Sequence, residues 1–260
     1  MERARRLSVP FVLSCAPRAL PPLPAAPQER EENTTLITSP SNPKLRLAHR
    51  LLGSRRQREK EGLFVVEGED LVQAADDAGV EPVDLLRAGE DVEPELLARI
   101  STMAHPPRVI GIYRSDALPR GVEPLSLSLW HVADPGNVGT LMRSADAFGA
   151  SLALSPGCAD VTGPKTVRAS AGAVFRVPVA RFEEPHGRRV ALVPEGGRPL
   201  AELDREVPIT YVLGAEREGL PDEVVAACDE TATIPISPSS ESLNVAMAGT
   251  IALYEHRRRG

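Results

Sequence analysis

The chain has 260 residues, a formal net charge of −6 and 3% aromatic residues, which suits one large or two small domains with an aliphatic core. The acidic balance argues against nucleic-acid binding through overall charge, and no apolar run is long enough to cross a membrane. Cys15, Cys158 and Cys228 have the spacing of neither a disulfide framework nor a zinc site, so we expect no metal and a reducing, cytoplasmic environment.

The first 32 residues have a composition that resembles a targeting segment. An Arg-rich start over residues 1–6 is followed by a mostly apolar stretch and then by a Pro/Ala-rich stretch. Pro10 interrupts the apolar part, which weakens the similarity to a signal or transit sequence. We therefore predict a disordered leader over residues 1–32, or an over-long start of the reading frame, with export as the minority interpretation.

Residues 33–115 predict a small α/β domain, because candidate strands and helices alternate. A helix is expected to start at Pro43, since proline suits the first helical position. Two further helices are expected over residues 71–78 and 93–103. Short buried strands are expected over residues 63–66, 83–86 and 109–113.

The front of this domain is basic, although the chain as a whole is acidic. Between Asn33 and Gly62 the only acidic residues are Glu59 and Glu61. A basic patch of this kind can contact an RNA backbone, whereas a solvated face would give the same pattern. The residues of the patch that we expect to contact RNA are Lys44, Arg46, Arg55, Arg56 and Arg58.

Residues 124–260 predict a second α/β domain, joined to the first by a linker that contains Pro119 and Gly121. Its strands are expected over residues 125–132, 151–154, 190–193, 209–213 and 231–236. Helices are expected between these strands, again an α/β pattern.

The stretch that follows the first of these strands, residues 134–149, carries a candidate site. Asn137 suits the N-cap of a helix, and Arg143 falls opposite the apolar stripe of that helix. Helical side chains lean toward the N-terminus, so Arg143 should lie over Gly139, which leaves room for it. Free N–H groups at the helix start favour an anion, so we expect a phosphate-sized anion near Arg143 and Asn137. A solvated arginine and an ordinary cap would give the same sequence pattern.

Two later stretches also combine buried segments with polar residues. Residues 212–221 place Glu216 at the end of a strand, where α/β proteins bind ligands, but they match neither common nucleotide-binding motif. A tight turn with solvated charges is the alternative interpretation. Between residues 157 and 178, Lys165 and Arg168 either contact an RNA backbone or lie on an ordinary exposed helix.

The closing stretch, residues 234–255, joins an apolar run to a Ser/Pro-rich loop and an apolar helix. A polar loop between two buried elements is a place where a site is expected, although an ordinary connection would look the same. Helical spacing predicts that one set of residues forms a buried stripe. This set is Leu243, Met247, Ile251 and Tyr254.

Together, residues 137–149, 213–219 and 234–245 closely resemble the three motifs of the SpoU (TrmH) branch of the SPOUT RNA methyltransferases. The opening residues 39–45 and 64–68 look like the substrate-binding domain that precedes the catalytic domain in many members. The resemblance covers residues 38–258, nearly everything except the leader. Three motifs in the right order are rarely matched by chance, although each motif alone is only a hypothesis.

The resemblance implies an α/β fold with a C-terminal SPOUT domain over residues 124–260, containing a parallel sheet and a deep trefoil knot. A small α/β domain similar to an RNA-binding ribosomal protein would precede it over residues 33–115. The implied reaction transfers a methyl group from S-adenosylmethionine to a ribose 2′-hydroxyl of RNA, without a metal. By analogy the two-domain layout favours 23S rRNA over tRNA. Members are typically homodimers whose active site uses residues of both subunits.

The resemblance also assigns roles to residues. Arg143 matches the catalytic arginine, for which we favour an electrostatic role over that of a base in a strongly perturbed environment. The other positions that match catalytic or substrate-orienting residues are Asn137, Glu216, Ser242 and Asn244. The positions that match the cofactor-binding wall are Val193, Gly214, Ile234, Ile236 and Leu243. Two alternatives stay open: an RNA-binding ribosome-assembly protein without methyl transfer, and an antibiotic-resistance rRNA methyltransferase.

Overall fold

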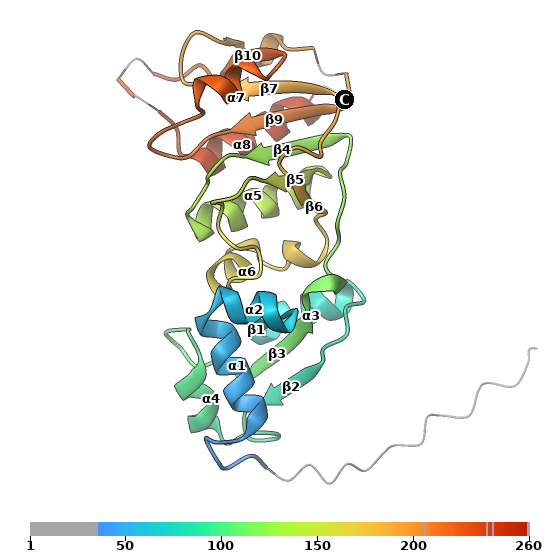
Figure 1. Ribbon diagram of the computed structural model, residues 1–260, viewed down its shortest axis with the longest axis vertical. Helices are drawn as coiled ribbons and strands as arrows, with labels where there is room; N and C mark the ends of the chain where they lie inside the picture. The colour runs from blue at the N-terminus through green and yellow to red at the C-terminus, as the bar shows by residue number, and fades with distance from the viewer. Residues whose placement is uncertain (1–35, 205, 238, 241, 259–260) are drawn as a thin grey trace, which may run out of the picture. The chain divides into compact units, whose positions relative to one another are not determined.

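The computed structural model describes residues 36–204, 206–237, 239–240 and 242–258 (Figure 1). The leader expected over residues 1–32 lies outside this range. Residues Thr35–Gly260 form one compact unit, so the division into domains over residues 33–115 and 124–260 stays a prediction. Among the described helices, none has the length and apolar composition needed to span a bilayer.

The first part of this unit is built on a three-stranded antiparallel sheet in the order β1-β3-β2. Its strands are β1 (Leu63–Glu67), β2 (Asp84–Arg87) and β3 (Val109–Arg114). Its helices are α1 (Pro43–Gly53), α2 (Arg55–Glu61), α3 (Glu69–Asp77) and α4 (Pro94–Ile100). Proline begins both α1 and α4, where a missing N–H costs no hydrogen bond. All three expected strands and all three expected helices are present, with bounds that differ by a few residues.

Helix α2 is an element that the sequence patterns do not predict. It has no apolar side chain, and its buried residue is Arg58. Ser54 caps its start by accepting a hydrogen bond from the N–H of Gln57, and Gly62 ends it with a left-handed φ of 63°. Because the helix has no apolar stripe, hydrophobic periodicity gives no signal for it.

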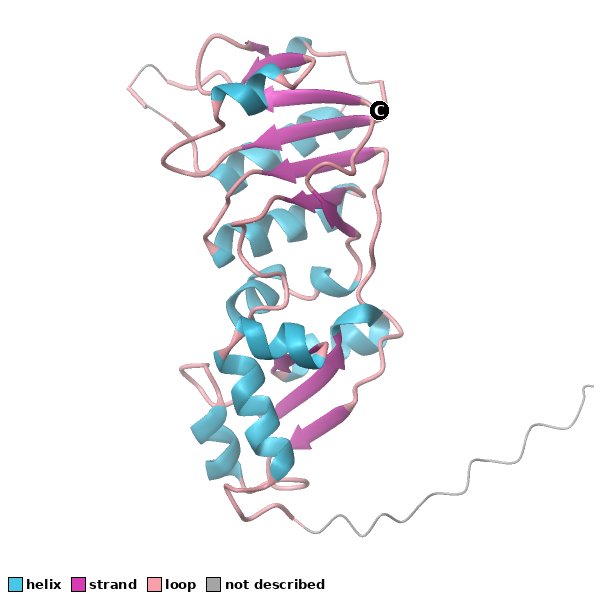
Figure 2. Cartoon of the chain, in the orientation of Figure 1, coloured by secondary structure: helices cyan, strands magenta, loops and turns pink. Residues whose placement is uncertain are grey.

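The second part is built on a seven-stranded sheet in the order β6-β5-β4-β9-β7-β10-β8, with all strand pairs parallel (Figures 1 and 2). Its strands are β4 (Leu125–Leu129), β5 (Ser151–Leu154), β6 (Val179–Arg181), β7 (Arg188–Leu192), β8 (Arg198–Pro199), β9 (Ile209–Leu213) and β10 (Glu230–Thr233). Its helices are α5 (Pro135–Phe148), α6 (Pro164–Ser170), α7 (Asp222–Ala226) and α8 (Val245–Arg257). Short 3₁₀ turns are η1 (Ser115–Ala117), η2 (Ala173–Phe175) and η3 (Leu200–Glu202). The expected α/β fold with a parallel sheet is confirmed, and the two short strands β6 and β8 are additional to it.

Helices cover both faces of the large sheet (Figure 2). On β9, Tyr211 and Leu213 belong to the main hydrophobic cluster, together with residues of α5 and α8. Val212, between them, packs instead with Val224 of α7. Successive side chains of a strand point to opposite faces, so α5 and α8 share one face and α7 lies on the other.

The buried face of α8 differs from the stripe expected from the sequence. Met247, Ile251 and Tyr254 are 60%, 36% and 53% exposed. A Cβ at Gly249 would lie 2.4 Å from Cδ2 of Leu141, so glycine allows α8 to approach α5 closely. The residues that α8 buries are Val245, Ala246, Gly249, Ala252 and Leu253. The prediction of a buried stripe is therefore wrong, because mostly small residues make the packing face and large apolar residues stand outside it.

A hydrophobic cluster is continuous between the two parts of the unit. The rings of Phe64 and Tyr113 in the first part lie 6.1 and 5.6 Å from the ring of Phe175 in η2, measured between centroids. Gly172, with a φ of 86°, also approaches α3 closely, because a Cβ there would lie 2.5 Å from Cβ of Ala74. The two parts therefore share apolar packing in addition to the connecting chain.

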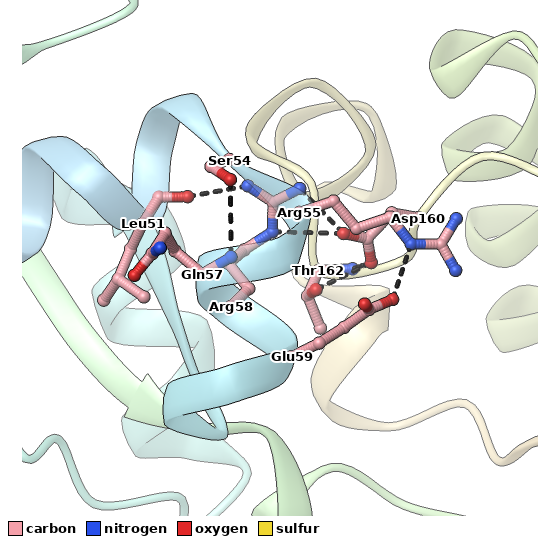
Figure 3. Close-up of polar contacts among 8 residues, drawn as sticks. All are labelled: Leu51, Ser54, Arg55, Gln57, Arg58, Glu59, Asp160 and Thr162. Atoms are coloured by element: carbon pink, nitrogen blue, oxygen red, sulfur yellow. Dashed lines mark hydrogen bonds and ion pairs between the residues drawn. The ribbon is translucent and has the colours of Figure 1, made fainter.

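Arg58 adds a buried polar contact between the two parts (Figure 3). Its Nε and Nη2 donate to Oδ2 of Asp160 at 3.1 and 2.7 Å, and its Nη1 donates to the carbonyl oxygen of Leu51 at 2.6 Å. Arg58 is only 6% exposed. The expectation that Arg58 contacts RNA is therefore wrong, because its guanidinium is buried and already bonded within the protein.

Arg168 makes a second polar contact between the parts. Its Nη1 donates to Oε2 of Glu67 at 2.6 Å and to Oγ1 of Thr102 at 2.8 Å. The carboxylate of Glu67 is buried, and it also accepts hydrogen bonds from the Ser101 hydroxyl and the Thr102 N–H. Arg168 thus neutralises a buried charge, and because its own side chain is 27% exposed, its assignment as an RNA contact stays a prediction.

The contact between Arg58 and Asp160 makes stability depend on pH. Burial raises the pKa of Asp160, but hydrogen bonds from Thr162 and Arg58 outweigh burial and hold that pKa below its ordinary value. A carboxyl group whose pKa is lower in the folded state stabilises the fold above its unfolded pKa of about 3.9, and this contribution is lost as the pH falls through the folded pKa. We expect the stability difference between the wild type and Asp160→Asn to shrink in acid, as measured by urea unfolding. A difference that is constant with pH would contradict this assignment.

Candidate active site

Loops from four neighbouring strands meet at one edge of the large sheet. Strands β4, β9, β7 and β10 are adjacent and parallel, so their carboxyl ends lie at the same edge (Figure 1). Among the described residues, the chain leaves these ends through residues 130–134, 214–221, 193–197, 234–237, 239–240 and 242–244. In open α/β sheets this edge is where ligands bind.

Three of these loops line a cavity of about 340 Å³, a volume in the range of small-molecule sites. The residues expected to form a cofactor wall all line this cavity, namely Val193, Gly214, Ile234, Ile236 and Leu243. Ser242, expected at the reacting centre, also lines it. The structure therefore brings together residues that lie up to 50 positions apart in the sequence.

The cavity combines an apolar wall with acidic groups. Ile234, Ile236 and Leu243 are half-buried in the wall, whereas Glu216 and Glu218 are exposed. Apolar surface suits a flat, weakly polar ring, and carboxylates favour a positively charged group nearby. Arg217, which lies between these two carboxylates in the sequence, is exposed and lines the cavity as well, so the arrangement suits a ligand that is apolar in one part and carries both positive and negative charge in another.

Gly214 is required for the shape of the loop that follows β9. A Cβ at this position would lie 2.1 Å from the backbone carbon of Gly219. The loop turns back on itself, with the N–H of Gly219 donating to the carbonyl oxygen of Ala215 at 2.9 Å. Only glycine at position 214 allows this return of the backbone, which brings Glu216 and Glu218 to the cavity.

A chain of hydrogen bonds joins three of the expected catalytic residues. Nδ2 of Asn137 donates to Oε1 of Glu216 at 2.5 Å, and Nδ2 of Asn244 donates to Oδ1 of Asn137 at 3.1 Å. Asn244 also caps α8, since its Oδ1 accepts from the N–H groups of Ala246 and Met247. The start of α5, the loop after β9 and the start of α8 are thus held together next to the cavity.

The cap of α5 is Asp134 rather than Asn137. The helix begins at Pro135, and Oδ1 of Asp134 accepts a hydrogen bond from the N–H of Asn137 at 2.9 Å. The prediction of a cap at Asn137 is therefore wrong, although an Asp directly before a Pro is itself a cap signal. With Asp134 as the cap, the amide of Asn137 is free to join Glu216 to Asn244.

Arg143 stands apart from this chain of hydrogen bonds. It is exposed on α5 and makes no hydrogen bond or ion pair with any residue in the described ranges. The space beside Gly139 is filled by α6, because a Cβ there would lie 2.4 Å from Cβ of Ala169. The expectation that Gly139 leaves room for Arg143 is therefore wrong, since this glycine serves the contact between two helices. No hydrogen bond joins Arg143 to Asn137.

The remaining residues expected to contact RNA differ in their surroundings, and none of them lines the cavity. Lys44 pairs with Asp84 at 2.5 Å, and Arg55 pairs with Glu59 at 2.8 Å. Within the described part of the chain, exposed residues without a side-chain partner include Arg46, Arg56 and Lys165. The basic patch is therefore partly neutralised by neighbouring acids.

Comparisons with known proteins agree with this architecture. A family model described as the SpoU rRNA Methylase family matches residues 124–254. An uncharacterized tRNA/rRNA methyltransferase of Synechocystis is 32% identical over an alignment that covers 86% of this chain and 93% of that protein. The 23S rRNA (uridine(2479)-2′-O)-methyltransferase of Streptomyces viridochromogenes is 30% identical, with 89% of this chain and 94% of that protein covered.

A solved structure of an rRNA methyltransferase is also similar to this chain. The crystal structure of an AdoMet-bound rRNA methyltransferase from Sinorhizobium meliloti matches with a TM-score of 0.77 and 28% identity, over 86% of this chain and 98% of that one. The family model covers half of the present chain, and the relatives cover most of it. The chain therefore belongs to the SpoU rRNA methylase family, a family of RNA methyltransferases.

Proposed function

We propose that this protein binds S-adenosylmethionine in the cavity and methylates a ribose 2′-hydroxyl of 23S rRNA. The observation that carries the proposal is the hydrogen-bonded chain from Asn244 through Asn137 to Glu216, which ends at a cavity-lining residue. Two relatives support it. The protein of Streptomyces viridochromogenes is named as a 23S rRNA 2′-O-methyltransferase, and the structure from Sinorhizobium meliloti is AdoMet-bound.

The residues that line the cavity fit this cofactor. Ile234, Ile236 and Leu243 offer an apolar wall to an adenine ring, and Gly214 leaves the backbone accessible. The carboxylates of Glu216 and Glu218 favour the positive charges of the sulfonium and the amino group. Bound S-adenosylmethionine supplies an electrophilic methyl group without help from a metal.

The protein's own side chains position the acceptor and stabilise charge. A ribose hydroxyl is a poor nucleophile, which must lose its proton during attack. Asn137 holds the carboxylate of Glu216, while the hydroxyl of Ser242 can orient a ribose oxygen. The guanidinium of Arg143 has no partner among the described residues, so it is available for an RNA phosphate or a developing alkoxide.

The active form in this proposal is a homodimer that associates through α5 and α8. These helices lie side by side, since the hydroxyls of Ser144 and Thr250 are 2.6 Å apart and the ring of Phe148 meets that of Tyr254 edge-on. The exposed stripe of Met247 and its neighbours on α8 thus lies beside the exposed face of α5, which carries Arg143. Exposed apolar stripes mark interfaces, and a two-fold interface here would bring Arg143 of one copy toward the site of the other.

Placing a charge in this stripe should produce a monomer. Met247→Glu puts a carboxylate into the proposed interface at a side chain that is already 60% exposed, so the fold should be retained. Sedimentation should show a dimer for the wild type and a monomer with little activity for Met247→Glu. Val83→Glu, at an apolar side chain that is 50% exposed in the first part, is the matched control and should stay dimeric. A monomeric wild type would refute the interface.

Two measurements test the cofactor and the reaction. Calorimetry should detect binding of S-adenosylmethionine to the wild type and an affinity about tenfold lower or worse for Gly214→Ala, because the added Cβ collides with the returning loop. Gly53→Ala, where a Cβ meets nothing within 4 Å, should bind normally. Mapping 2′-O-methylation in cells with and without the gene should then reveal one mark missing from 23S rRNA.

The outcomes of these measurements separate the alternatives. A mark missing only from tRNA would contradict the rRNA assignment while leaving the reaction intact. A wild type that does not bind S-adenosylmethionine would favour an RNA-binding ribosome-assembly protein. Loss of antibiotic resistance together with the mark would identify a resistance methyltransferase.

Three finer features complete the proposal. The proposal includes the deep trefoil knot that the family resemblance implies, and residues of the three loops assigned to it line one cavity, namely 193–194, 214–219, 234, 236 and 242–243. Residues 33–115, of which the structure describes 36–115, act as the RNA-binding domain. The protein works in the cytoplasm, where the scattered cysteines stay reduced and ribosomal RNA is present.

A further inference from the structure

The first part of the unit contains a second cavity of about 310 Å³, lined by residues of α1 and α4. Arg46, His49 and Arg50 come from α1, and Arg99 comes from α4. Among the described residues that line this cavity, none is acidic. It is a separate site from the cavity at the large sheet, with which it shares no residue.

The three arginines of this cavity lack the partners that neighbouring cations have. Lys44 pairs with Asp84, and Arg55 pairs with Glu59. The side chains of Arg46, Arg50 and Arg99, by contrast, make no hydrogen bond or ion pair with the described residues. Arg46 and Arg50 are four positions apart on one helix, where like charges repel. A bound anion would remove this repulsion, so the cavity is electrostatically matched to a negatively charged ligand.

The floor of the cavity is apolar. Leu45 and Leu96 are 2% and 7% exposed, and Ile100 is half-buried beside them. A site for inorganic phosphate alone would not need such a floor. Unpaired RNA bases, in contrast, stack on aromatic rings or on the guanidinium planes of arginine and pack against apolar side chains, while cations hold the phosphates.

We propose that this cavity holds one unpaired nucleotide of the RNA substrate. Its base would lie on Leu96 and Ile100, and its phosphates would lie among Arg46, Arg50 and Arg99. A cavity of this size admits a single nucleotide but not a base-paired helix, which points to a single-stranded loop or bulge. The inference rests on the proposed RNA substrate, and it keeps Arg46 of α1 from the expected contacts while adding Arg50 and Arg99.

Binding of a single-stranded RNA tests this site. The probe is a fluorescein-labelled RNA of mixed sequence, titrated by anisotropy with the full chain at several salt concentrations. Arg50→Ala/Arg99→Ala should weaken binding about tenfold or more, and the slope of log K against log salt should fall by about 1.4, since each phosphate contact on a single strand contributes about 0.7. Arg108→Ala removes a cation from the same part, at a side chain that is 89% exposed, and should bind within about twofold of the wild type.

Competition distinguishes a nucleotide from a phosphate. Unlabelled single-stranded RNA should displace the probe, whereas a blunt RNA duplex of equal length and inorganic phosphate should compete weakly. Equal competition by the duplex would overturn the inference, as would wild-type affinity in the double variant or an equal loss in Arg108→Ala.

Cofactor binding keeps this test separate from the proposed function. The double variant should bind S-adenosylmethionine as the wild type does, because no residue of the second cavity lines the first. A wild type that binds RNA through Arg50 and Arg99 but does not bind S-adenosylmethionine would refute the methyltransferase proposal and support the nucleotide site. Normal methylation together with unchanged RNA affinity in the double variant would support the methyltransferase proposal and refute the nucleotide site.

Discussion

Arg143→Ala should lower the rate of methyl transfer at least about a hundredfold while leaving the affinity for S-adenosylmethionine within about twofold of the wild type. Arg143 does not line the cavity and has no partner among the described residues, so its removal leaves both the fold and the cofactor wall intact. The variant loses the positive charge that would bind an RNA phosphate or stabilise a developing alkoxide. Single-turnover methylation with labelled cofactor measures the rate, and calorimetry measures the affinity.

Arg143→Lys and a mixed-subunit experiment sharpen this prediction. Lysine keeps the charge but not the planar fork of arginine, so this variant should have intermediate activity. If Arg143 acts on the partner's site, mixing Arg143→Ala subunits with Gly214→Ala subunits should restore activity at a cofactor concentration too low to saturate Gly214→Ala, because one site of each mixed dimer contains both intact residues. No restoration would place Arg143 in its own subunit's site, and full activity of Arg143→Ala would remove its catalytic assignment.

Arg58→Ala should lower the free energy of unfolding by about 3–5 kcal/mol, because it leaves a largely buried carboxylate without its cation. The side chain of Asp160 is 17% exposed, and the carbonyl of Leu51 would lose its donor as well. Guanidinium unfolding of the full chain, followed by far-UV circular dichroism, measures the change. RNA affinity per folded molecule should be unaffected, in contrast to a surface arginine that contacts RNA.

Arg55→Ala is the matched control for this prediction. Arg55 lies in the same helix but is 59% exposed and pairs with Glu59, so its removal should cost no more than about 0.5 kcal/mol. Arg58→Met/Asp160→Leu, which replaces both charges with apolar groups, should recover much of the loss. An effect of Arg58→Ala as small as that of Arg55→Ala would mean that the ion pair does not stabilise the fold.

Much of the architecture can be predicted from the sequence because buried parallel strands are continuous aliphatic runs. The strand over residues 209–213 and the one over 151–154 have the predicted bounds, since apolar residues fill both faces of the sheet there. The residues of the cavity wall are predicted by the family resemblance instead, since only Gly214 among them directly follows one of these two strands. Local hydrophobic patterns are sufficient to predict a strand where burial of its side chains alone decides its bounds.

Contacts between distant polar residues could not be predicted in this way. Arg58 lies in an entirely polar helix, and the residue that explains its burial, Asp160, is 102 positions away. Composition therefore suggests a surface patch where the structure has a buried ion pair. The prediction of a buried stripe on α8 is wrong for a related reason. The closest packing of this helix is made by Gly249, which has no side chain to mark the buried face.

The contacts of Arg58 with Asp160 and of Arg168 with Glu67 have a consequence for substrate choice. These contacts tie the first part to the second, so under the two proposals above they would hold the proposed nucleotide cavity and the proposed cofactor cavity at a fixed separation. An RNA that occupies both cavities gains affinity through effective concentration. This gain requires that the folded RNA places its unpaired nucleotide and its target ribose at the same distance from each other as the two cavities. The protein would then select its target by the distance between two points in a folded RNA rather than by a sequence of bases.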